Sequence, residues 1–224
     1  MKKPKITIGI PCFNQSQYLA DCIESILTQT VKPHEIIICN DGSQDETRYI
    51  AKSYPEVKYI EQVNKGLASA RNTMIMNMTG DYLYPLDADD MMLENCIEKI
   101  IETIEKNPDV DIIAPSFKCF GKHTESVILT DNPVLEDFKI ANRIGYFSAI
   151  KKEALLEIGG YSPRMTHGYE DYHLWVNLLS NGKKIITIKD ILILYRTKEN
   201  SMITDAQKHH SELMTQIHKD FPLW

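Results

Sequence analysis

Short apolar runs alternate with longer segments of mixed polarity along the first 90 residues of the chain. Runs rich in β-branched residues and bounded by turn formers predict buried strands. They lie at residues 5–10, 35–40, 57–62 and 81–86. Between them, apolar residues recur every three or four positions, as at Leu19, Ile23 and Ile26, which predicts amphipathic helices. Strands that alternate with helices predict an α/β fold with a mostly parallel sheet covered on both faces.

The pattern becomes less regular after residue 90. We expect helices at about 92–106, 152–158 and 170–180, strands at 110–117, 145–150, 184–188 and 191–196, and a helical tail from Thr204. No internal repeat, low-complexity tract or Gly/Ser-rich linker divides the sequence. We therefore predict a single domain over residues 1–224.

Polar residues follow each of the four predicted strands of the first half. The loops are Pro11 to Asn14, Asn40 to Ser43, Asn64 to Gly66, and Asp87 to Asp90. Each loop alone has an ordinary structural explanation, as a turn or as a helix cap. Ligands of open α/β sheets bind beyond the carboxyl ends of the strands, so four such loops together favour a binding site.

The fourth loop holds three aspartates, Asp87, Asp89 and Asp90, within four positions. Clustered carboxylates repel one another, and their pKa values rise unless a cation lies among them. Mg²⁺ and Mn²⁺ prefer oxygen ligands, and Mg²⁺ is usually held by one or two carboxylates together with phosphate groups of a substrate. The cluster therefore predicts a divalent cation with a diphosphate as its second partner.

Composition limits the class of protein. Of the 224 residues 43% are hydrophobic and 25% charged, which is typical of a globular protein, and the net charge of −6 argues against a nucleic-acid partner. No run reaches the roughly 18 apolar residues of a membrane span, and the N-terminus is a poor signal peptide. The five cysteines form no close pair, which favours a reducing compartment. We expect a soluble cytoplasmic protein and leave peripheral membrane association open.

Five segments resemble a known family in order and spacing. They are PCFNQSQYLADCIESILTQT, EIIICNDGSQDET, NKGLASARN, GDYLYPLDADD and GYEDYHLWVNLLSNG. Together they are similar to the family 2 glycosyltransferases of GT-A fold, from about Ile6 to Arg196. The resemblance implies a Rossmann-like central sheet flanked by helices, with a nucleotide-binding half at 1–90, an acceptor-binding half at 91–200 and a helical tail at 201–224.

The resemblance also implies a reaction. A sugar of hexosyl or N-acetylhexosaminyl type moves, with inversion, from a nucleotide-diphosphate donor to a hydroxyl acceptor in cell-surface polysaccharide or glycan biosynthesis. A UDP-sugar is the expected donor. Candidate acceptors are a lipid-linked glycan, a polysaccharide precursor or a protein, and the expected cofactor is Mn²⁺ or Mg²⁺.

Roles pass to individual residues through the same resemblance. The residues implied to bind the nucleotide are Pro11, Phe13, Asn14, Asp41, Asn64, Gly66, Arg71, Asp87 and Ala88. Among them, Asp41 is expected to accept a hydrogen bond from the nucleobase. Asp89 is the implied principal metal ligand, with Asp87 beside it at the ribose or the metal.

Asp171, the second residue of the Glu170–Asp171 pair, resembles the general base that takes the proton of the acceptor hydroxyl. It lies one helical turn before the apolar stripe that includes Leu174 and Trp175, so it is expected to face the cleft. The alternative is that Glu170 and Asp171 only favour the positive end of a helix dipole. The other motifs make that alternative the weaker one.

The sequence departs from the family pattern at several positions. Lys198 stands where a metal-binding histidine is common; it either brings its own charge to the diphosphate or, as we prefer, is solvated while water completes the metal shell. Asn40 replaces a common aspartate. The histidines His167, His173, His209 and His210 are scattered, which favours surface or helix positions. His167 is the exception, because it lies in the loop before Asp171 and could contact an acceptor.

Two rival functions remain at this point. A non-catalytic module that binds nucleotide sugars would explain the missing histidine. A sugar nucleotidyltransferase of related fold would need a glycine-rich, basic loop after the first strand, and residues 11–17 have neither property. Dinucleotide-binding and P-loop fingerprints are absent as well.

Overall fold

The computed structural model describes residues 3–199, 202–222 and 224. Its sheet has the order β3-β2-β1-β4-β8-β6-β9-β5, with β7 paired to β6 at the side. The strands are β1 (Ile6–Cys12), β2 (Glu35–Asn40), β3 (Val57–Glu61), β4 (Tyr82–Pro85), β5 (Met91–Met92), β6 (Ile112–Gly121), β7 (Ser126–Val127), β8 (Ala149–Lys151) and β9 (Ile185–Thr197).

Most of the strands point the same way. β1 to β4 are mutually parallel, and β6 and β9, which are parallel to each other, share their direction because β8 is antiparallel to both β4 and β6. The carboxyl ends of these six strands therefore lie at one edge of the sheet. This confirms the predicted α/β fold with a mostly parallel sheet.

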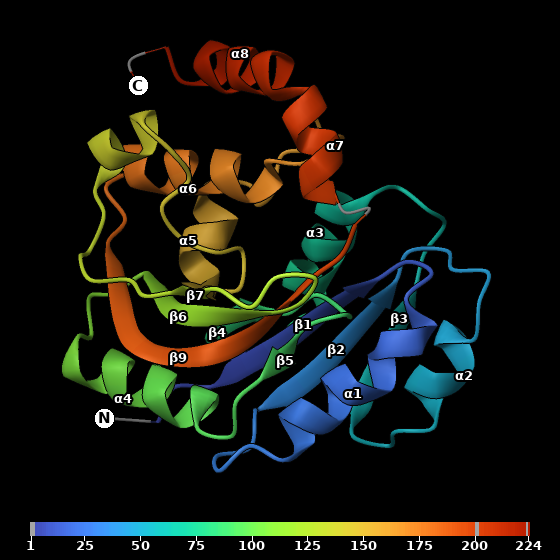
Figure 1. Ribbon diagram of the computed structural model, residues 1–224. Coiled ribbons are helices and arrows are strands. Elements are labelled where there is room, and N and C mark those ends of the chain that lie inside the picture. The colour runs from blue at the N-terminus through green and yellow to red at the C-terminus, as the bar shows by residue number, and fades with distance from the viewer. Residues whose placement is uncertain (1–2, 200–201, 223) are drawn as a thin grey trace.

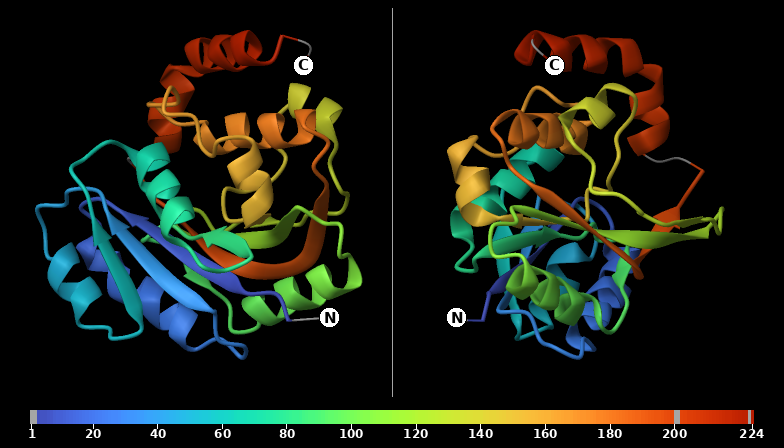
Figure 2. Two further views of the ribbon diagram at one scale, coloured as in Figure 1. Left: turned by 180° about the vertical axis from the view of Figure 1, so that it is seen from behind. Right: turned by 90° about the vertical axis from the view of Figure 1, so that its left-hand side faces the viewer.

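Helices cover both faces of the sheet. They are α1 (Ser16–Leu27), α2 (Thr47–Lys52), α3 (Leu67–Asn77), α4 (Cys96–Lys106), α5 (Lys152–Glu157), α6 (Glu170–Ser180), α7 (Met202–Lys208) and α8 (His210–Asp220), with a 3₁₀ turn at Leu135–Lys139. α1, α2 and α4 lie on one face and the other helices on the opposite face (Figures 1 and 2). Each face has its own apolar core, one built around Ile8 and Ile97 and one around Met74 and Trp175.

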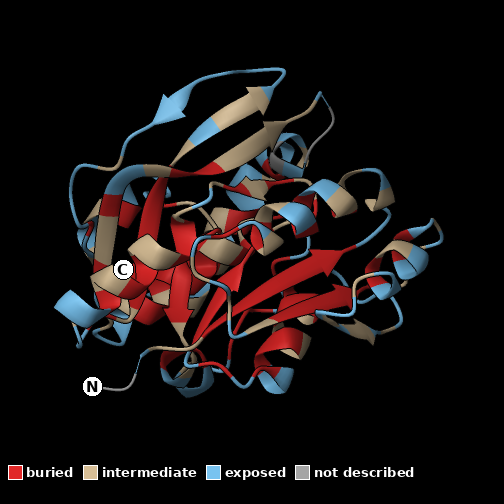
Figure 3. Ribbon diagram, turned by 90° about the horizontal axis from the view of Figure 1, so that it is seen from below, coloured by how far each residue is buried: buried red, intermediate tan, exposed pale blue. Residues whose placement is uncertain are grey.

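Burial is greatest in the central strands (Figure 3). Every residue of β1 is buried, whereas both residues of β7 are exposed. Among the described residues, no helix has the length and apolar character that crossing a bilayer requires. All five cysteines are free, and all except Cys119 are buried.

The second half differs from its predicted elements in three places. Residues 145–150 were predicted as one strand, but β8 begins only at Ala149, because the chain turns where the Ser148 N–H donates to the Tyr146 carbonyl at 2.9 Å. The helix predicted from residue 92 begins at Cys96. The strands predicted at 184–188 and 191–196 form one strand, β9, whose pairing with β6 shifts register on both sides of Ser116.

Candidate active site

The loops after β1 and β2 are tied together by side chains. The Asn14 N–H donates to Ser43 Oγ at 2.9 Å, and Asn14 Oδ1 accepts from the Gln44 N–H at 2.8 Å. Asn14 has φ of 52°, a left-handed conformation that asparagine tolerates better than most residues. Asn40, the last residue of β2, accepts from the Ser43 N–H with its side chain. The two loops therefore form one rigid ledge at the carboxyl edge of the sheet.

Asp41 fixes a third loop to this ledge. Its carboxylate accepts from Gln62 Nε2 at 2.7 Å, from the Lys65 N–H at 2.9 Å and from the Gly66 N–H at 2.8 Å. Gly42 is required here, because a Cβ at this position would lie 2.9 Å from the Asn64 backbone nitrogen. Asp41 thus fixes the loop that leads into the N-terminus of α3, a role that the sequence did not suggest. Its predicted contact with a nucleobase stays a prediction.

The other residues predicted to bind a nucleotide lie around the same loops. Phe13 is 47% exposed, and Asn64 and Gly66 are exposed, so these three residues are open to a ligand. Pro11 and Ala88 are buried at the same edge of the sheet. The structure therefore brings the predicted nucleotide side together at one edge.

Arg71 on α3 connects the end of β4 with the start of α6. Its Nη2 donates to Asp87 Oδ1 at 2.9 Å and its Nη1 to Glu170 Oε1 at 2.6 Å. The Arg71 side chain is fully buried, whereas that of Asp87 is 29% exposed. Arg71 was predicted to border the nucleotide pocket. Its position shows a further role: it is the cation that links the aspartate loop to the Glu170–Asp171 pair.

Aromatic rings enclose the Arg71 guanidinium. Its carbon lies 4.9 Å from the centre of the Tyr146 ring and 5.3 Å from that of Tyr161. Its Nε has no hydrogen-bond partner among the described residues. Burial and the two carboxylates hold this cation in place, so its position is set before any ligand binds.

Asp89 forms an ion pair with Lys198, whose Nζ lies 2.5 Å from Asp89 Oδ2. Lys198 follows directly after β9, and β9 ends at the same edge as β4, so the register of the sheet delivers the ammonium to the aspartates. The preferred prediction that Lys198 is solvated was wrong, because its side chain is only 26% exposed and contacts Asp89.

Asp90, the third acid, is nearly excluded from solvent at 1% exposure. The Tyr146 hydroxyl donates to its Oδ2, and the Arg196 N–H donates to its Oδ1 at 2.7 Å. Tyr146 also accepts from the Asp87 N–H at 3.1 Å. Asp90 therefore braces the loop that presents Asp87 and Asp89.

The pKa values of two of these aspartates are raised. The pKa of Asp87 rises to about 6, because loss of water outweighs the attraction of Arg71 and because Asp89 and Glu170 repel its charge. The pKa of Asp90 lies well above its usual range, chiefly through burial and then through repulsion from Asp89. Negative charge on this loop is therefore costly, and a cationic or hydrogen-bonding partner would stabilise its ionised form.

Asp171 differs from these acids because no side-chain cation contacts it among the described residues. Its Oδ2 accepts from Asn142 Nδ2 at 2.9 Å and its Oδ1 from the Tyr172 N–H at 2.7 Å. Burial, followed by repulsion from Glu170, raises its pKa to about 7 in spite of the attraction of Arg71. A carboxylate that titrates near neutral pH is suited to general-base chemistry.

Several partners of the site were not predicted from the sequence. Tyr146 lies in a segment that was predicted as a strand, and Asn142 lies in a stretch without any periodic pattern. Tyr18 of α1 packs against two cations. The centre of its ring lies 4.4 Å from the Arg196 guanidinium carbon and 5.2 Å from Lys198 Nζ.

The histidines are less scattered than we expected. His167 was predicted to contact an acceptor, but its Nδ1 lies 3.3 Å from Asp205 Oδ2, and its ring stacks on that of His209. His173 is buried beside Asp220, with its Nε2 at 3.0 Å from Asp220 Oδ2. His167 and His209, scattered in the sequence, are therefore neighbours in the structure, and the contact of His167 with an acceptor stays a prediction.

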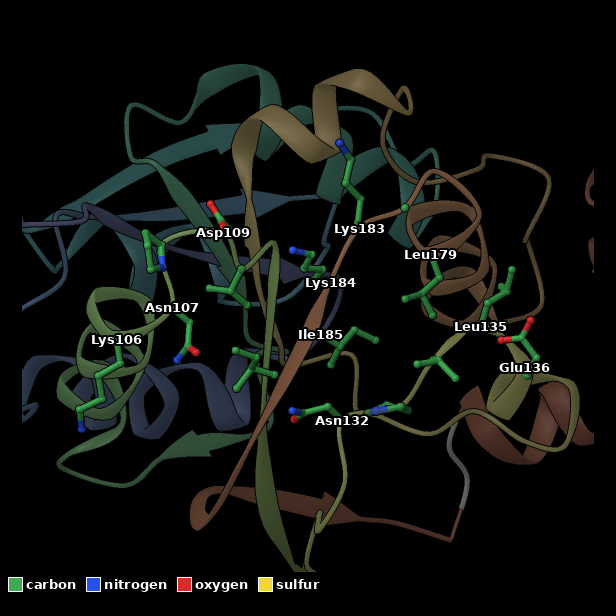
Figure 4. Close-up of a pocket in the computed structure, with 16 residues that line it drawn as sticks. Lys106, Asn107, Asp109, Asn132, Leu135, Glu136, Leu179, Lys183, Lys184 and Ile185 are labelled. Carbon is green, nitrogen blue, oxygen red and sulfur yellow. The ribbon is translucent and has the colours of Figure 1, made fainter.

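A cavity of about 720 Å³ lies at the opposite end of β9 from Lys198 (Figure 4). Figure 4 shows Asn132, Lys184 and Ile185 on its wall, beside the C-terminal end of α4. None of the predicted site residues lines it. This cavity is therefore separate from the candidate active site.

Comparisons with known proteins agree on one family. The model of "Glycosyl transferase family 2" matches residues 7–163. The chain is 31% identical over 218 residues to glycosyltransferase GlyA of Streptococcus pneumoniae, covering 88% of this chain and 31% of GlyA. It is 38% identical over 108 residues to chondroitin synthase of Escherichia coli, covering 46% of this chain and 16% of that enzyme. The chain thus spans less than a third of the length of these two relatives.

The fold is similar to that of a solved structure. Staphylococcus aureus TarS 1-349, in complex with UDP-GlcNAc, superposes with a TM-score of 0.81 at 16% sequence identity. The superposition covers 95% of this chain and 65% of that chain. At this identity the likeness shows a shared GT-A fold.

Proposed function

Because the chain belongs to glycosyl transferase family 2, we propose that it moves a sugar from a UDP-sugar donor to a hydroxyl acceptor with inversion of the anomeric centre. In this proposal residues 1–90 bind the nucleotide, residues 91–200 bind the acceptor and residues 201–224 form a helical tail. The observation that carries it is the Asp87–Arg71–Glu170 connection, which joins the aspartate loop to the acid of raised pKa, Asp171.

The donor side of the proposal rests on the ledge of loops. Exposed Phe13 offers an aromatic face to a nucleobase, and exposed backbone at Asn64 and Gly66 lies beside it. TarS, which shares the fold, was solved with UDP-GlcNAc, so UDP-N-acetylhexosamines are the first donors to test and UDP-hexoses the second. Residues 1–90 carry every nucleotide contact that we propose.

The acceptor side of the proposal rests on Asp171. As a carboxylate it accepts the proton of the acceptor hydroxyl while that oxygen bonds to the anomeric carbon. The bond from that carbon to the diphosphate breaks at the same time, and the electron pair leaves with the diphosphate. Asn142 and the Tyr172 N–H hold the Asp171 carboxylate in place. Repulsion from Glu170, which Arg71 fixes, helps to keep the pKa of Asp171 high.

Members of this family generally use a divalent metal ion. Asp89 and Asp87 have the hard oxygen donors that Mn²⁺ and Mg²⁺ prefer, and the partly exposed Asp87 side chain can be reached from solvent, so both side chains fit as ligands. A bound ion would supply positive charge for the departing diphosphate. Lys198 already neutralises Asp89 and so competes for the same carboxylate.

The second candidate function is a non-catalytic module that binds nucleotide sugars, which the Asp89–Lys198 pair favours. Asp171→Asn separates the two candidates, because it keeps the shape of the side chain and removes the base. We expect UDP release from a panel of UDP-sugars to fall about 10²- to 10⁴-fold, while UDP affinity measured by calorimetry stays within about twofold.

Glu153→Gln is the matched control, since Glu153 is likewise an acid in the first turn of a helix but is 81% exposed. It should leave both readouts unchanged. Wild-type protein that binds UDP but releases none from any donor would support the module and refute the transferase. Wild-type protein that binds no UDP would refute both candidates.

A further inference from the structure

Three potential metal ligands meet outside the candidate active site. His167, Asp205 and His209 each place one ligand atom within 4.8 Å of the other two. His167 comes from the loop before α6, Asp205 lies in α7, and His209 follows α7. His167 is far in the sequence from Asp205 and His209, so the docking of α7 on the loop creates the group.

The distances within the group suit a shared metal ion. His167 Nδ1 and Asp205 Oδ2 are 3.3 Å apart. Two ligands of a tetrahedral zinc ion, each at about 2.0–2.1 Å, lie roughly 3.3 Å apart. Asp205 and His209 are four positions apart, and the His209 N–H bonds to the Asp205 carbonyl, so both side chains share one helical face.

A second carboxylate stands behind one of the histidines. His209 Nδ1 lies 3.3 Å from Glu212 Oε2. Histidines that bind metals commonly donate their other ring N–H to a carboxylate, which fixes the tautomer and strengthens the ligand. The two imidazole rings stack with centroids 4.0 Å apart and planes 16° apart, so the two histidines lie side by side.

We propose that His167, Asp205 and His209 form a site for one divalent transition-metal ion, with Zn²⁺ as the preferred ion. Imidazole and carboxylate ligands suit Zn²⁺, and a water molecule would complete the coordination. The side chains are 44%, 49% and 35% exposed, in that order, so the ion can enter from solvent.

The site would fasten the C-terminal helices to the loop in front of Asp171. α7 already packs closely on this loop, because a Cβ at Gly168 would lie 2.8 Å from the Ala206 side chain. Next to it, the Tyr169 hydroxyl and His210 Nδ1 are 2.9 Å apart. Glu170 and Asp171 follow immediately in the chain, so a bound ion would restrain the segment that leads to the proposed base.

Zn²⁺ titration of the full chain without a histidine tag tests this proposal. By calorimetry we expect one Zn²⁺ per chain in the wild type and loss of this binding in His167→Ala and in His209→Ala. Glu212→Gln should weaken binding about tenfold, as is typical when the outer partner of a ligand is removed. Bound Co²⁺ should give the visible absorption of a tetrahedral site in the wild type and not in His167→Ala or His209→Ala.

His123→Ala is the matched control, since His123 is exposed and it bonds to the Thr197 hydroxyl through its backbone N–H and carbonyl. It should bind Zn²⁺ as the wild type does. Hydrogen exchange adds an independent readout: Zn²⁺ should slow exchange of residues 162–169 and of α7 in the wild type. Equal Zn²⁺ binding by His167→Ala and the wild type would overturn the site. Zn²⁺ binding that does not slow hydrogen exchange would mean an adventitious ion only and would overturn it as well. Neither result bears on UDP binding or sugar transfer.

Discussion

Two groups of acids face each other across Arg71, and they differ in how their charge is balanced. In the loop after β4, Asp87 contacts Arg71, Asp89 contacts Lys198, and Asp90 accepts from Tyr146 and Arg196. At the start of α6, Asp171 has only neutral donors, and its pKa rises to about 7. Each acid of the loop is held by a cation or a hydrogen-bond donor, whereas Asp171, which has no cation beside it among the described residues, is suited to accept a proton from a substrate.

Removing Arg71 should break this arrangement with the largest effect. Arg71→Met leaves the buried Glu170 without its cation and removes the partner of Asp87, and the loss of one partner from a buried pair costs about 3–5 kcal/mol. We expect a drop of that size in the free energy of unfolding, measured with urea. Arg48→Met is the control, since the exposed Arg48–Glu61 pair should contribute at most about 1 kcal/mol.

If both variants unfold at the same urea concentration as the wild type, the Arg71 connection does not hold the two groups of acids together. A variant that keeps its fold offers a second readout. Without the positive charge of Arg71, the pKa of Asp171 should rise further, because this cation is the attraction that now opposes burial and Glu170.

The pH dependence of the reaction should reveal Asp171. A base must be ionised, so protonation of a carboxylate with a pKa near 7 removes activity as pH falls through that value. We expect kcat/KM to decline by about tenfold per pH unit below this point and to level off above it. The groups that act on Asp171 are Glu170, Arg71, Asn142 and the Tyr172 N–H.

Asn142→Ala sharpens this test, because it removes a donor that stabilises the charged form. The acidic limb of the profile should move to higher pH, while UDP affinity stays unchanged. A profile that is flat from about pH 5 to 8 in the wild type would exclude Asp171 as a base of raised pKa.

The sequence predicted the first group of acids far better than the environment of the second. β1, α1 and β2 follow from local periodicity, and strand ends in a parallel sheet meet at one edge, so Asp41 and Asp87 to Asp90 could be placed together. Asp171 was recognised by its motif. Its neighbours were not, because Asn142 and Arg71 reach α6 from distant segments that no local pattern connects.

The same limit explains the errors in the second half. Arg71 and Glu170 are 99 residues apart, and Lys198 meets Asp89 only because β9 pairs with β6 over its whole length. β5, a strand of two residues, exists only through its pairing with β9. Contacts of this kind depend on the final register of the sheet, which composition and periodicity do not specify.

Tyr146→Phe should loosen the aspartate loop without touching its cations. The hydroxyl donates to Asp90 Oδ2 and accepts from the Asp87 N–H, so its removal leaves this oxygen and this N–H without the Tyr146 partner. We expect a loss of about 1–3 kcal/mol in the free energy of unfolding, measured with urea. Tyr49→Phe is the control, since Tyr49 is 71% exposed, and it should change little. Equal stability of the two variants would mean that Asp90 is not held by Tyr146.

The smallest expected effect separates the two roles that Lys198 could have beside Asp89. Lys198→Gln removes a positive charge that competes for this carboxylate, so Mn²⁺ should bind about tenfold more tightly, a gain of roughly 1.4 kcal/mol. Mn²⁺ binding is followed by electron paramagnetic resonance, with no need for turnover. Lys122→Gln is the control, because Lys122 is 48% exposed and pairs at 4.0 Å with Glu199.

Chelation of the wild-type protein tests which cation contacts the diphosphate. If the Lys198 ammonium serves that purpose, UDP affinity should persist in a chelator and fall in Lys198→Gln. If a metal ion does, the chelator should weaken UDP binding in the wild type, and Lys198→Gln should bind UDP at lower Mn²⁺ concentrations. Equal Mn²⁺ affinity in wild type, Lys198→Gln and Lys122→Gln would mean that the pairing of Lys198 with Asp89 does not control this corner of the site.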